Sequence, residues 1–137
     1  QESNLSKTKR AIDISRRLVK KNQPSIKIIG VTKTQTADTI RQAYNAGITD
    51  IGENYVQEAL AKMDRLRDLN IAWHFIGSIQ SNKTRLIAEN FAWIHSVDSL
   101  KLATRLSKHC PKGKILNLLI QLKRENSCKY PCRTIDY

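Results

Sequence analysis

Lys33 lies directly after a short apolar segment, in the stretch VTKTQ, where we expect a strand of an α/β protein to end. A lysine at such a strand end is partly removed from water, and desolvation favours the uncharged amine, which attacks aldehydes to form a Schiff base. The alternative is an ordinary solvated lysine in a loop, which is the more common situation for a lysine. The position of Lys33 makes it a candidate for Schiff-base chemistry.

Three later corners of the chain also place polar side chains directly after apolar segments. The residues at these corners are Glu53, Asn54 and Tyr55, then Ser78, Gln80, Asn82 and Lys83, and finally His95 and Ser96. Because the carboxyl ends of parallel strands meet at one rim, we expect these side chains to converge with Lys33 around a ligand. Asn54 and Gln80 are also typical of turns and helix caps, so that interpretation stays open for them. His74 and His95 are predicted to be structural histidines with satisfied hydrogen bonds.

The segments that position these residues alternate between short apolar runs and amphipathic stretches. Strands are predicted at residues 26–31, 48–53, 71–77, 91–97 and 114–122. Helices are predicted at residues 2–21, 36–47, 56–66 and 81–90 and after Asp98, which we expect to cap the last of them. The first strand is almost wholly apolar, which is typical of a strand covered on both faces. A Thr or Asp side chain, Thr36 or Asp38, is expected to cap the second helix at its start, and Gly47 to end it.

Strands that alternate with helices indicate parallel pairing and right-handed crossovers. Two architectures fit this α/β order: an open doubly wound sheet and a (β/α)8 TIM barrel. No G-x-G-x-x-G motif follows the first strand, so a Rossmann dinucleotide site is not supported. A complete barrel has about 250 residues. The 137 residues of this chain hold about five of its strands.

The net charge of +12, from 24 basic and 12 acidic residues, raises the question of a nucleic-acid partner. The basic residues are scattered, however, and Lys62, Arg65 and Lys101 lie at polar positions of amphipathic helices, where a solvated face is expected. No basic stretch is flanked by aromatic residues, so we expect no specific nucleic-acid binding. The alternative is a basic binding module for RNA or an acidic partner, which steep salt dependence would support.

The cysteines and the apolar runs of the sequence indicate in which cellular compartment the protein is expected. Cys110, Cys128 and Cys132 do not suit a disulfide framework, and the C-x3-C spacing is not a usual zinc pairing. We expect free thiols and no metal site. No apolar run reaches the ~18 residues of a membrane span, and the N-terminal stretch QESNLSKTKR lacks the apolar core of a signal peptide. The expectation is a cytoplasmic protein without membrane contact.

Three long segments resemble those of one known family. They are GVTKTQTADTIRQAYNAGITDIGENYVQEAL, WHFIGSIQSNKTRLIAENFAWIHSVDSLKLATRL and LNLLIQL, which together cover most of residues 26–122. The chain is similar here to the pyridoxal phosphate homeostasis proteins, also called the YggS or proline synthase co-transcribed family. The GENYVQE and WHFIG-x-x-Q-x-NK motifs are long and unusual, so chance similarity is a poor explanation.

The resemblance implies a fold like the N-terminal barrel domain of alanine racemase, here as a partial (β/α)8 barrel. It implies that pyridoxal 5′-phosphate (PLP) is held as a Schiff base on Lys33, with Asn54 near the cofactor. It also implies a role in vitamin B6 homeostasis without catalytic turnover. The alternative within PLP chemistry is a racemase-like enzyme with Glu53, Tyr55 or His95 as its acid or base.

The stretch KRENSCKYPCRTIDY, residues 123–137, departs from the family pattern. We therefore expect residues 1–122 to form the N-terminal part of a PLP-binding barrel and residues 123–137 to be a divergent tail. The C-terminal phosphate-binding segments of the family are not present, which predicts a C-terminally truncated chain. A non-functional fragment with reduced PLP affinity is thus an alternative to a homeostasis protein. Self-association through open barrel edges is expected.

Overall fold

A computed structural model covers the chain, and the residues that it describes are 4–18 and 26–122. In chain order the elements are α1 (Asn4–Leu18), β1 (Ile29–Val31), α2 (Ala37–Asn45), β2 (Asp50–Glu53), α3 (Val56–Arg65), β3 (Ala72–Phe75), the short 3-10 helix η1 (Ser81–Lys83), α4 (Thr84–Asn90), β4 (Trp93–Val97), α5 (Leu100–His109) and β5 (Asn117–Ile120). The predicted order of strands and helices is confirmed. The predicted tail at 123–137 lies outside the described residues.

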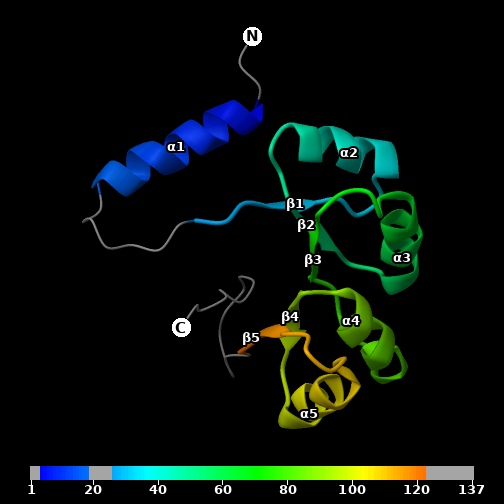
Figure 1. The fold of residues 1–137 in the computed structure, drawn as a ribbon. Helices are drawn as coiled ribbons and strands as arrows, with labels where there is room; N and C mark the ends of the chain where they lie inside the picture. Colours follow the sequence, from blue (N-terminus) through cyan, green and yellow to red (C-terminus); the bar gives the residue numbers. More distant parts are fainter. Residues whose placement is uncertain (1–3, 19–25, 123–137) are drawn as a thin grey trace.

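The five strands form one parallel sheet in the order β1-β2-β3-β4-β5, so each strand pairs with its neighbour in the sequence. Consecutive strands joined by crossovers of the same hand place every connecting helix on one face. Figure 1 shows helices α2–α5 along one side of the strands. A doubly wound sheet reverses its strand order and carries helices on both faces. The arrangement is therefore that of a partial (β/α)8 barrel.

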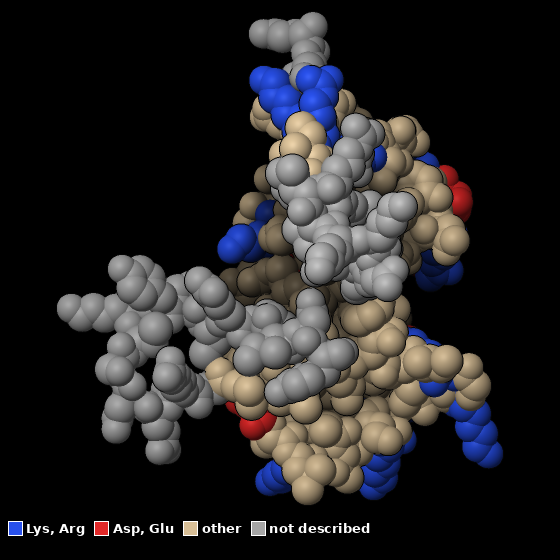
Figure 2. Space-filling view, turned by 90° about the vertical axis from the view of Figure 1, so that its left-hand side faces the viewer, with Lys and Arg blue, Asp and Glu red and all other residues tan. Residues whose placement is uncertain are grey.

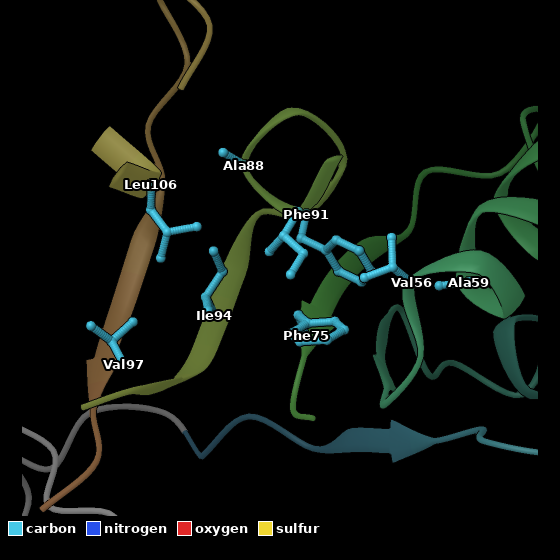
Figure 3. Packing of buried hydrophobic residues seen from close by; sticks show 9 residues of the cluster. Val56, Ala59, Phe75, Ala88, Phe91, Ile94, Val97 and Leu106 are labelled. Carbon is cyan, nitrogen blue, oxygen red and sulfur yellow. The ribbon is translucent and has the colours of Figure 1, made fainter. Parts of the chain in front are cut away.

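Two apolar clusters between the sheet and its helices hold the fold together. The larger is centred on Phe75, Phe91 and Ile94, each at most 1% exposed. Figure 3 shows the side chains of this cluster between the strands and the helices, and the rings of Phe75 and Phe91 meet edge to face at 5.2 Å. The smaller cluster joins α2 to the sheet through Ile40 and Ile51. Burial of each such side chain contributes roughly 1.5–3 kcal/mol, so these clusters determine which side of each strand faces the helices.

The other face of the sheet is less covered than the sequence predicted. β1 is shorter than the predicted strand at 26–31, and the side chain of Val31 is 54% exposed. β5 is shorter than the predicted strand at 114–122, and Ile120 is 65% exposed. The prediction of a first strand covered on both faces is wrong for the described residues, because α2–α5 pack on one face and β1 is an outer strand.

The observed ends of α2 agree with the sequence prediction, whereas the residue that caps α5 differs from the predicted one. Thr36 caps α2 by accepting a hydrogen bond from a backbone N–H of the first turn. Gly47 follows the end of α2 with a φ of 95°, a conformation that favours glycine. At α5 the capping side chain is that of Ser99 and not that of Asp98. Ser and Asp are both good N-caps, so only the backbone geometry decides between these neighbours.

Figure 2 views the molecule from the side opposite helices α2–α5, with the lysine and arginine side chains spread around the edge of that face. Among residues 4–18 and 26–122, no helix is both long enough and apolar enough to cross a membrane. The same residues contain no group of three or more His, Cys, Asp or Glu side chains placed to hold a metal ion. Cys110 is a free, half-buried thiol, and Cys128 and Cys132 lie outside the described residues.

Candidate functional site

Lys33, the first predicted site residue, stands in the turn directly after β1, and its side chain is exposed. The expected partial desolvation of Lys33 is therefore wrong in this structure. The reason is that β1 is an outer strand of the described sheet and pairs only with β2. No second strand of that sheet therefore lies beside the turn that carries Lys33. The amine of Lys33 is accessible to reagents in solvent.

A cavity of about 460 Å³ opens at the ends of β2 and β3. The structure brings residues from two of the predicted corners together in its lining, namely Asn54, Tyr55, Ser78, Gln80 and Lys83. Asn54 Oδ1 is fully buried and has no hydrogen-bond partner among the described residues. A buried amide oxygen without a partner costs ~1–3 kcal/mol, so Asn54 has unused hydrogen-bonding capacity beside the cavity. Lys33 and His95 do not line this cavity.

Gly77 lets the chain after β3 pass close to the loop that carries Asn54. A Cβ placed on Gly77 would lie 2.1 Å from the backbone oxygen of Asn54 and 2.8 Å from its carbonyl carbon, distances that real Cβ atoms essentially never show. Any side chain at position 77 would displace the Asn54 backbone. The shape of the cavity therefore depends on a glycine at this position.

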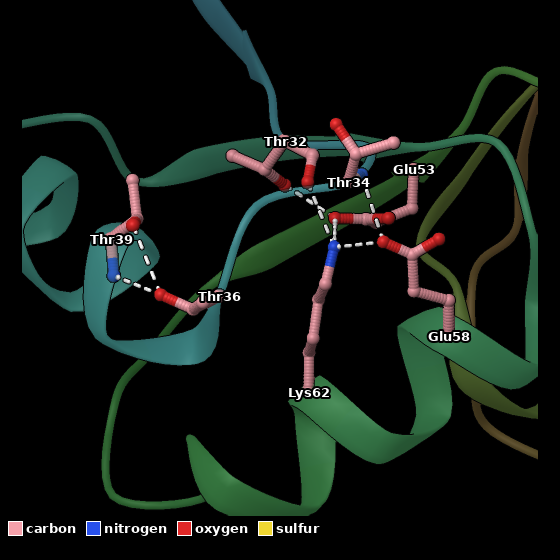
Figure 4. A network of polar contacts seen from close by, with 7 residues as sticks. All are labelled: Thr32, Thr34, Thr36, Thr39, Glu53, Glu58 and Lys62. Carbon is pink, nitrogen blue, oxygen red and sulfur yellow. Dashed lines mark hydrogen bonds and ion pairs between the residues drawn. The ribbon is translucent and has the colours of Figure 1, made fainter.

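A buried ion network joins β1, β2 and α3 on the helix side of the sheet (Figure 4). Lys62 Nζ lies 2.8 Å from both Glu53 Oε1 and Glu58 Oε1, and it donates to the backbone oxygen of Thr32 at 2.8 Å. Glu53 is 0% exposed and Lys62 is 7% exposed, and Thr32 donates its hydroxyl to Glu53 over 2.5 Å. Burial lowers the pKa of Lys62, but its hydrogen bonds with the two carboxylates outweigh burial and raise that pKa overall. The ammonium is therefore charged at neutral pH.

Two residues of this network, Glu58 and Lys62, were not among the site residues that the sequence predicted. Lys62 was expected on a solvated helix face, and that expectation is wrong because its ammonium reaches back between α3 and the sheet. The sequence does carry a signal for the network. Glu58 and Lys62 have the i, i+4 spacing that places two side chains side by side on a helix, and Glu53 ends the preceding strand.

A second polar network surrounds His74, which faces away from the helices because its strand neighbour Phe75 faces them. His74 Nε2 lies 2.9 Å from Asp50 Oδ1, and its Nδ1 lies 2.9 Å from His95 Nε2. Because a carboxylate only accepts, His74 Nε2–H donates to Asp50, and Nδ1 accepts from His95 when both rings are neutral. Burial lowers the pKa of His74 and outweighs the hydrogen bond with Asp50, which raises it, while Lys27 lowers it further. The prediction of a satisfied structural histidine is confirmed at His74.

Comparisons with known proteins bear on the identity of the chain. It is 47% identical over 120 residues to the pyridoxal phosphate homeostasis protein of Pseudomonas aeruginosa, an alignment that covers 87% of this chain and 52% of that protein. It is 42% identical over 124 residues to the protein of the same name from Haemophilus influenzae, with 88% and 52% covered. The chain is a relative of the pyridoxal phosphate homeostasis proteins. No family model matches it.

Solved structures show a similarity of fold as well as of sequence. PipY of Synechococcus elongatus with PLP bound is 44% identical, with a TM-score of 0.70, over 82% of this chain and 53% of PipY. PipY without PLP is 41% identical, with a TM-score of 0.71, over 89% of this chain and 56% of PipY. The chain spans about half the length of the curated pyridoxal phosphate homeostasis proteins that it matches.

Proposed function

We propose that this chain binds PLP and takes part in cytoplasmic PLP (vitamin B6) homeostasis without catalytic turnover. The observation that supports this most directly is the 44% identity, over 82% of the chain, to PipY, a protein whose structure was solved with PLP bound. The names of the curated relatives support the same role.

The residues at the carboxyl ends of β1 and β2 fit this cofactor. PLP supplies an aldehyde, and addition of Lys33 Nζ to its carbon with loss of one water molecule gives an imine without any oxidant or further reactant. Lys33 offers an exposed amine after β1. Asn54 lines the cavity after β2, the next strand of the sheet, and its buried amide oxygen has no partner among the described residues. The Asn54 side chain carries both an acceptor oxygen and a donor NH2 group, which supports an interaction with the polar groups of PLP.

The experiment that tests this function is a titration of the 137-residue chain with PLP. Binding is followed by the imine absorbance, and the attachment site by borohydride reduction and peptide mass spectrometry. We expect a saturable band and a label on Lys33, both lost in Lys33→Ala and both kept in Lys101→Ala, which removes an exposed lysine of α5. A label that persists in Lys33→Ala contradicts the proposal. Saturation only at PLP concentrations far above those that full-length relatives need would instead indicate a fragment with reduced affinity.

The proposal of binding without turnover has a separate test. Glu53, one of the candidate bases, is fully buried on the helix side of the sheet, where its Oε1 contacts Lys62 and Thr32, so it is not exposed to a substrate in solvent. Incubation of the PLP-loaded chain with L-alanine should yield D-alanine no faster than free PLP does, measured by chiral chromatography. Racemisation above that background, lost in Lys33→Ala, would support a racemase-like enzyme.

Copies of the chain are also proposed to associate through the outer strands of the sheet. Within the described sheet, β1 and β5 each pair on one side only, and Val31 and Ile120 are 54% and 65% exposed. Strand edges with free backbone groups and exposed apolar side chains favour pairing with another chain. Sedimentation velocity over a range of concentrations should show a dimer or larger species. A monomer at every concentration would rule this association out.

A further inference from the structure

One helix, α3, contacts the backbone on both sides of Lys33. Lys62 donates to the backbone oxygen of Thr32, the residue before Lys33, at 2.8 Å. Glu58 accepts from the backbone N–H of Thr34, the residue after Lys33, at 2.8 Å. Figure 4 shows both side chains reaching from α3 to the chain between β1 and α2. The turn that carries Lys33 is therefore tied at each end to the same helix.

Thr34 shows why this turn needs support from outside. Its φ is 64°, in the left-handed region that a residue with a branched Cβ rarely adopts. Such a conformation persists only where the surrounding contacts hold it. The hydrogen bond from Thr34 N–H to Glu58 Oε1 is a contact of this kind. Loss of the acceptor is expected to let the turn relax toward more common backbone conformations.

Glu58 and Lys62 act together with Glu53, and we call these three residues the α3 clamp. Lys62 Nζ lies 2.8 Å from the carboxylates of both Glu58, four residues before it on α3, and Glu53, at the end of β2. The Lys62 ammonium, and after it the N–H of Thr34, holds the pKa of Glu58 below its usual range. Glu58 therefore remains a charged acceptor at neutral pH, and the clamp keeps its contacts under the conditions in which PLP is proposed to bind.

We propose that Glu58 and Lys62 are positioning residues for Lys33, because they fix the turn that holds its amine at the carboxyl end of β1. This inference rests on the proposed function. An amine on a fixed turn is confined to a smaller region than one on a mobile turn, and reactions between well-placed groups lose less entropy on the way to the transition state. The α3 clamp is therefore expected to raise the rate at which Lys33 reacts with the aldehyde of PLP.

The test compares substitutions at Glu58 that differ in one property. Glu58→Gln keeps an oxygen that accepts from Thr34 N–H, whereas Glu58→Met has a similar length and no such acceptor. The Glu58 side chain is 32% exposed, so these changes leave the core intact, and Glu58→Ala is a second variant without an acceptor. Glu89→Met is the matched control, because it removes a helix carboxylate that pairs with Arg85 at i, i+4 on α4.

Two readouts separate positioning from simple structural support. The first is the rate of Lys33 labelling by PLP, trapped with borohydride and measured by peptide mass spectrometry well below the melting temperature of each variant. The second is amide hydrogen exchange at Thr34. We expect Glu58→Met and Glu58→Ala to slow labelling about tenfold and to speed exchange at Thr34. Glu58→Gln and Glu89→Met should label within about twofold of the unchanged chain, since each keeps the acceptor for Thr34.

The outcomes distinguish this inference from the proposed function. If the unchanged chain is labelled at Lys33 and Glu58→Met is labelled equally fast, the positioning role is overturned and the proposed function stands. A lower melting temperature in Glu58→Met without slower labelling also overturns the positioning role, since it shows structural support alone. If the unchanged chain is not labelled at Lys33, the proposed function is overturned, and this inference with it.

Discussion

Lys33 and Asn54, the side chains proposed for PLP, occupy different environments. Lys33 is exposed after β1, while Asn54 lines a cavity after β2 with a buried, unpaired oxygen. β1 and β2 are paired in parallel, so a ligand that touches both residues must lie over the carboxyl edge of these two strands. The assignment of both residues as cofactor contacts stays a prediction from the sequence.

Replacement of Asn54 by alanine should weaken PLP binding roughly two- to tenfold, because one hydrogen bond to a buried amide contributes about 0.5–1.5 kcal/mol. Equilibrium titration of the imine absorbance measures the change. Asn70→Ala removes an exposed amide before β3 and should bind like the unchanged chain. If Asn54→Ala also binds like the unchanged chain, Asn54 has no place in the site.

The lowered pKa of His74 predicts a pH-dependent stability. Its usual pKa is 6.5, and burial holds the folded-state pKa below that value. As the pH falls below 6.5, the unfolded chain takes up a proton at His74 before the folded chain does, so the free energy of unfolding decreases, by at most about 1.4 kcal/mol per pH unit. Urea denaturation at several pH values measures this slope.

The matched variants for this slope are His74→Gln and His109→Gln. His74→Gln removes the titrating ring and should flatten the dependence between pH 6.5 and more acidic values. His109 ends α5, outside the contacts of His74 with Asp50 and His95, so His109→Gln should keep the slope. An unchanged slope in His74→Gln would show that another group causes it.

At the scale of elements, α3 carries contacts to both parts of the candidate site. Its first residues line the cavity that contains Asn54. Further along the helix, Glu58 and Lys62 contact the turn of Lys33. A shift of α3 would therefore alter the surroundings of both proposed cofactor contacts. The helix is held against the sheet by apolar side chains and by the buried ion pair with Glu53.

Lys62→Met should lower the free energy of unfolding by about 3–5 kcal/mol, because it leaves the fully buried carboxylate of Glu53 without its cation. Denaturant unfolding measures the change. The double variant Glu53→Gln with Lys62→Met removes both charges and should recover part of the loss. Lys101→Met, on an exposed face of α5, should stay within about 0.5 kcal/mol. Equal losses in the single and double variants would show that the charge of Glu53 is not the cause.

At the scale of the whole molecule, the strand order is the decisive feature. Among residues 4–18 and 26–122, five parallel strands in sequence order leave β1 and β5 as outer strands, with helices α2–α5 on one face. This arrangement explains why Val31 and Ile120 are exposed although both belong to apolar strands. It also explains the exposure of Lys33, which follows an outer strand.

The net charge of +12 predicts nucleic-acid binding that is weak, general and sensitive to salt. Figure 2 shows lysine and arginine side chains spread around the viewed face, an arrangement suited to diffuse attraction. Fluorescence anisotropy with two unrelated duplexes should give equal affinities at low salt, and both should fall steeply as salt is added. A preference for one duplex that persists at high salt would contradict the expectation of no specific nucleic-acid partner.

The sequence by itself determined the order of helices and strands, a Thr or Asp cap at the start of α2, the glycine turn at Gly47, and the placement of Lys33 and Asn54 at strand ends. These features depend on residues close together in the chain, through apolar periodicity and local backbone preference. The apolar pattern alone fitted both a doubly wound sheet and a barrel, because strand order is a pairing between distant segments. The family resemblance favoured the barrel, and the strand order of the tertiary structure confirmed it. Only the tertiary structure decided which polar residues are buried. Lys62 donates a hydrogen bond to the backbone of Thr32, which is thirty residues earlier in the chain. The apolar pattern of a helix does not predict a contact between residues so far apart in the sequence.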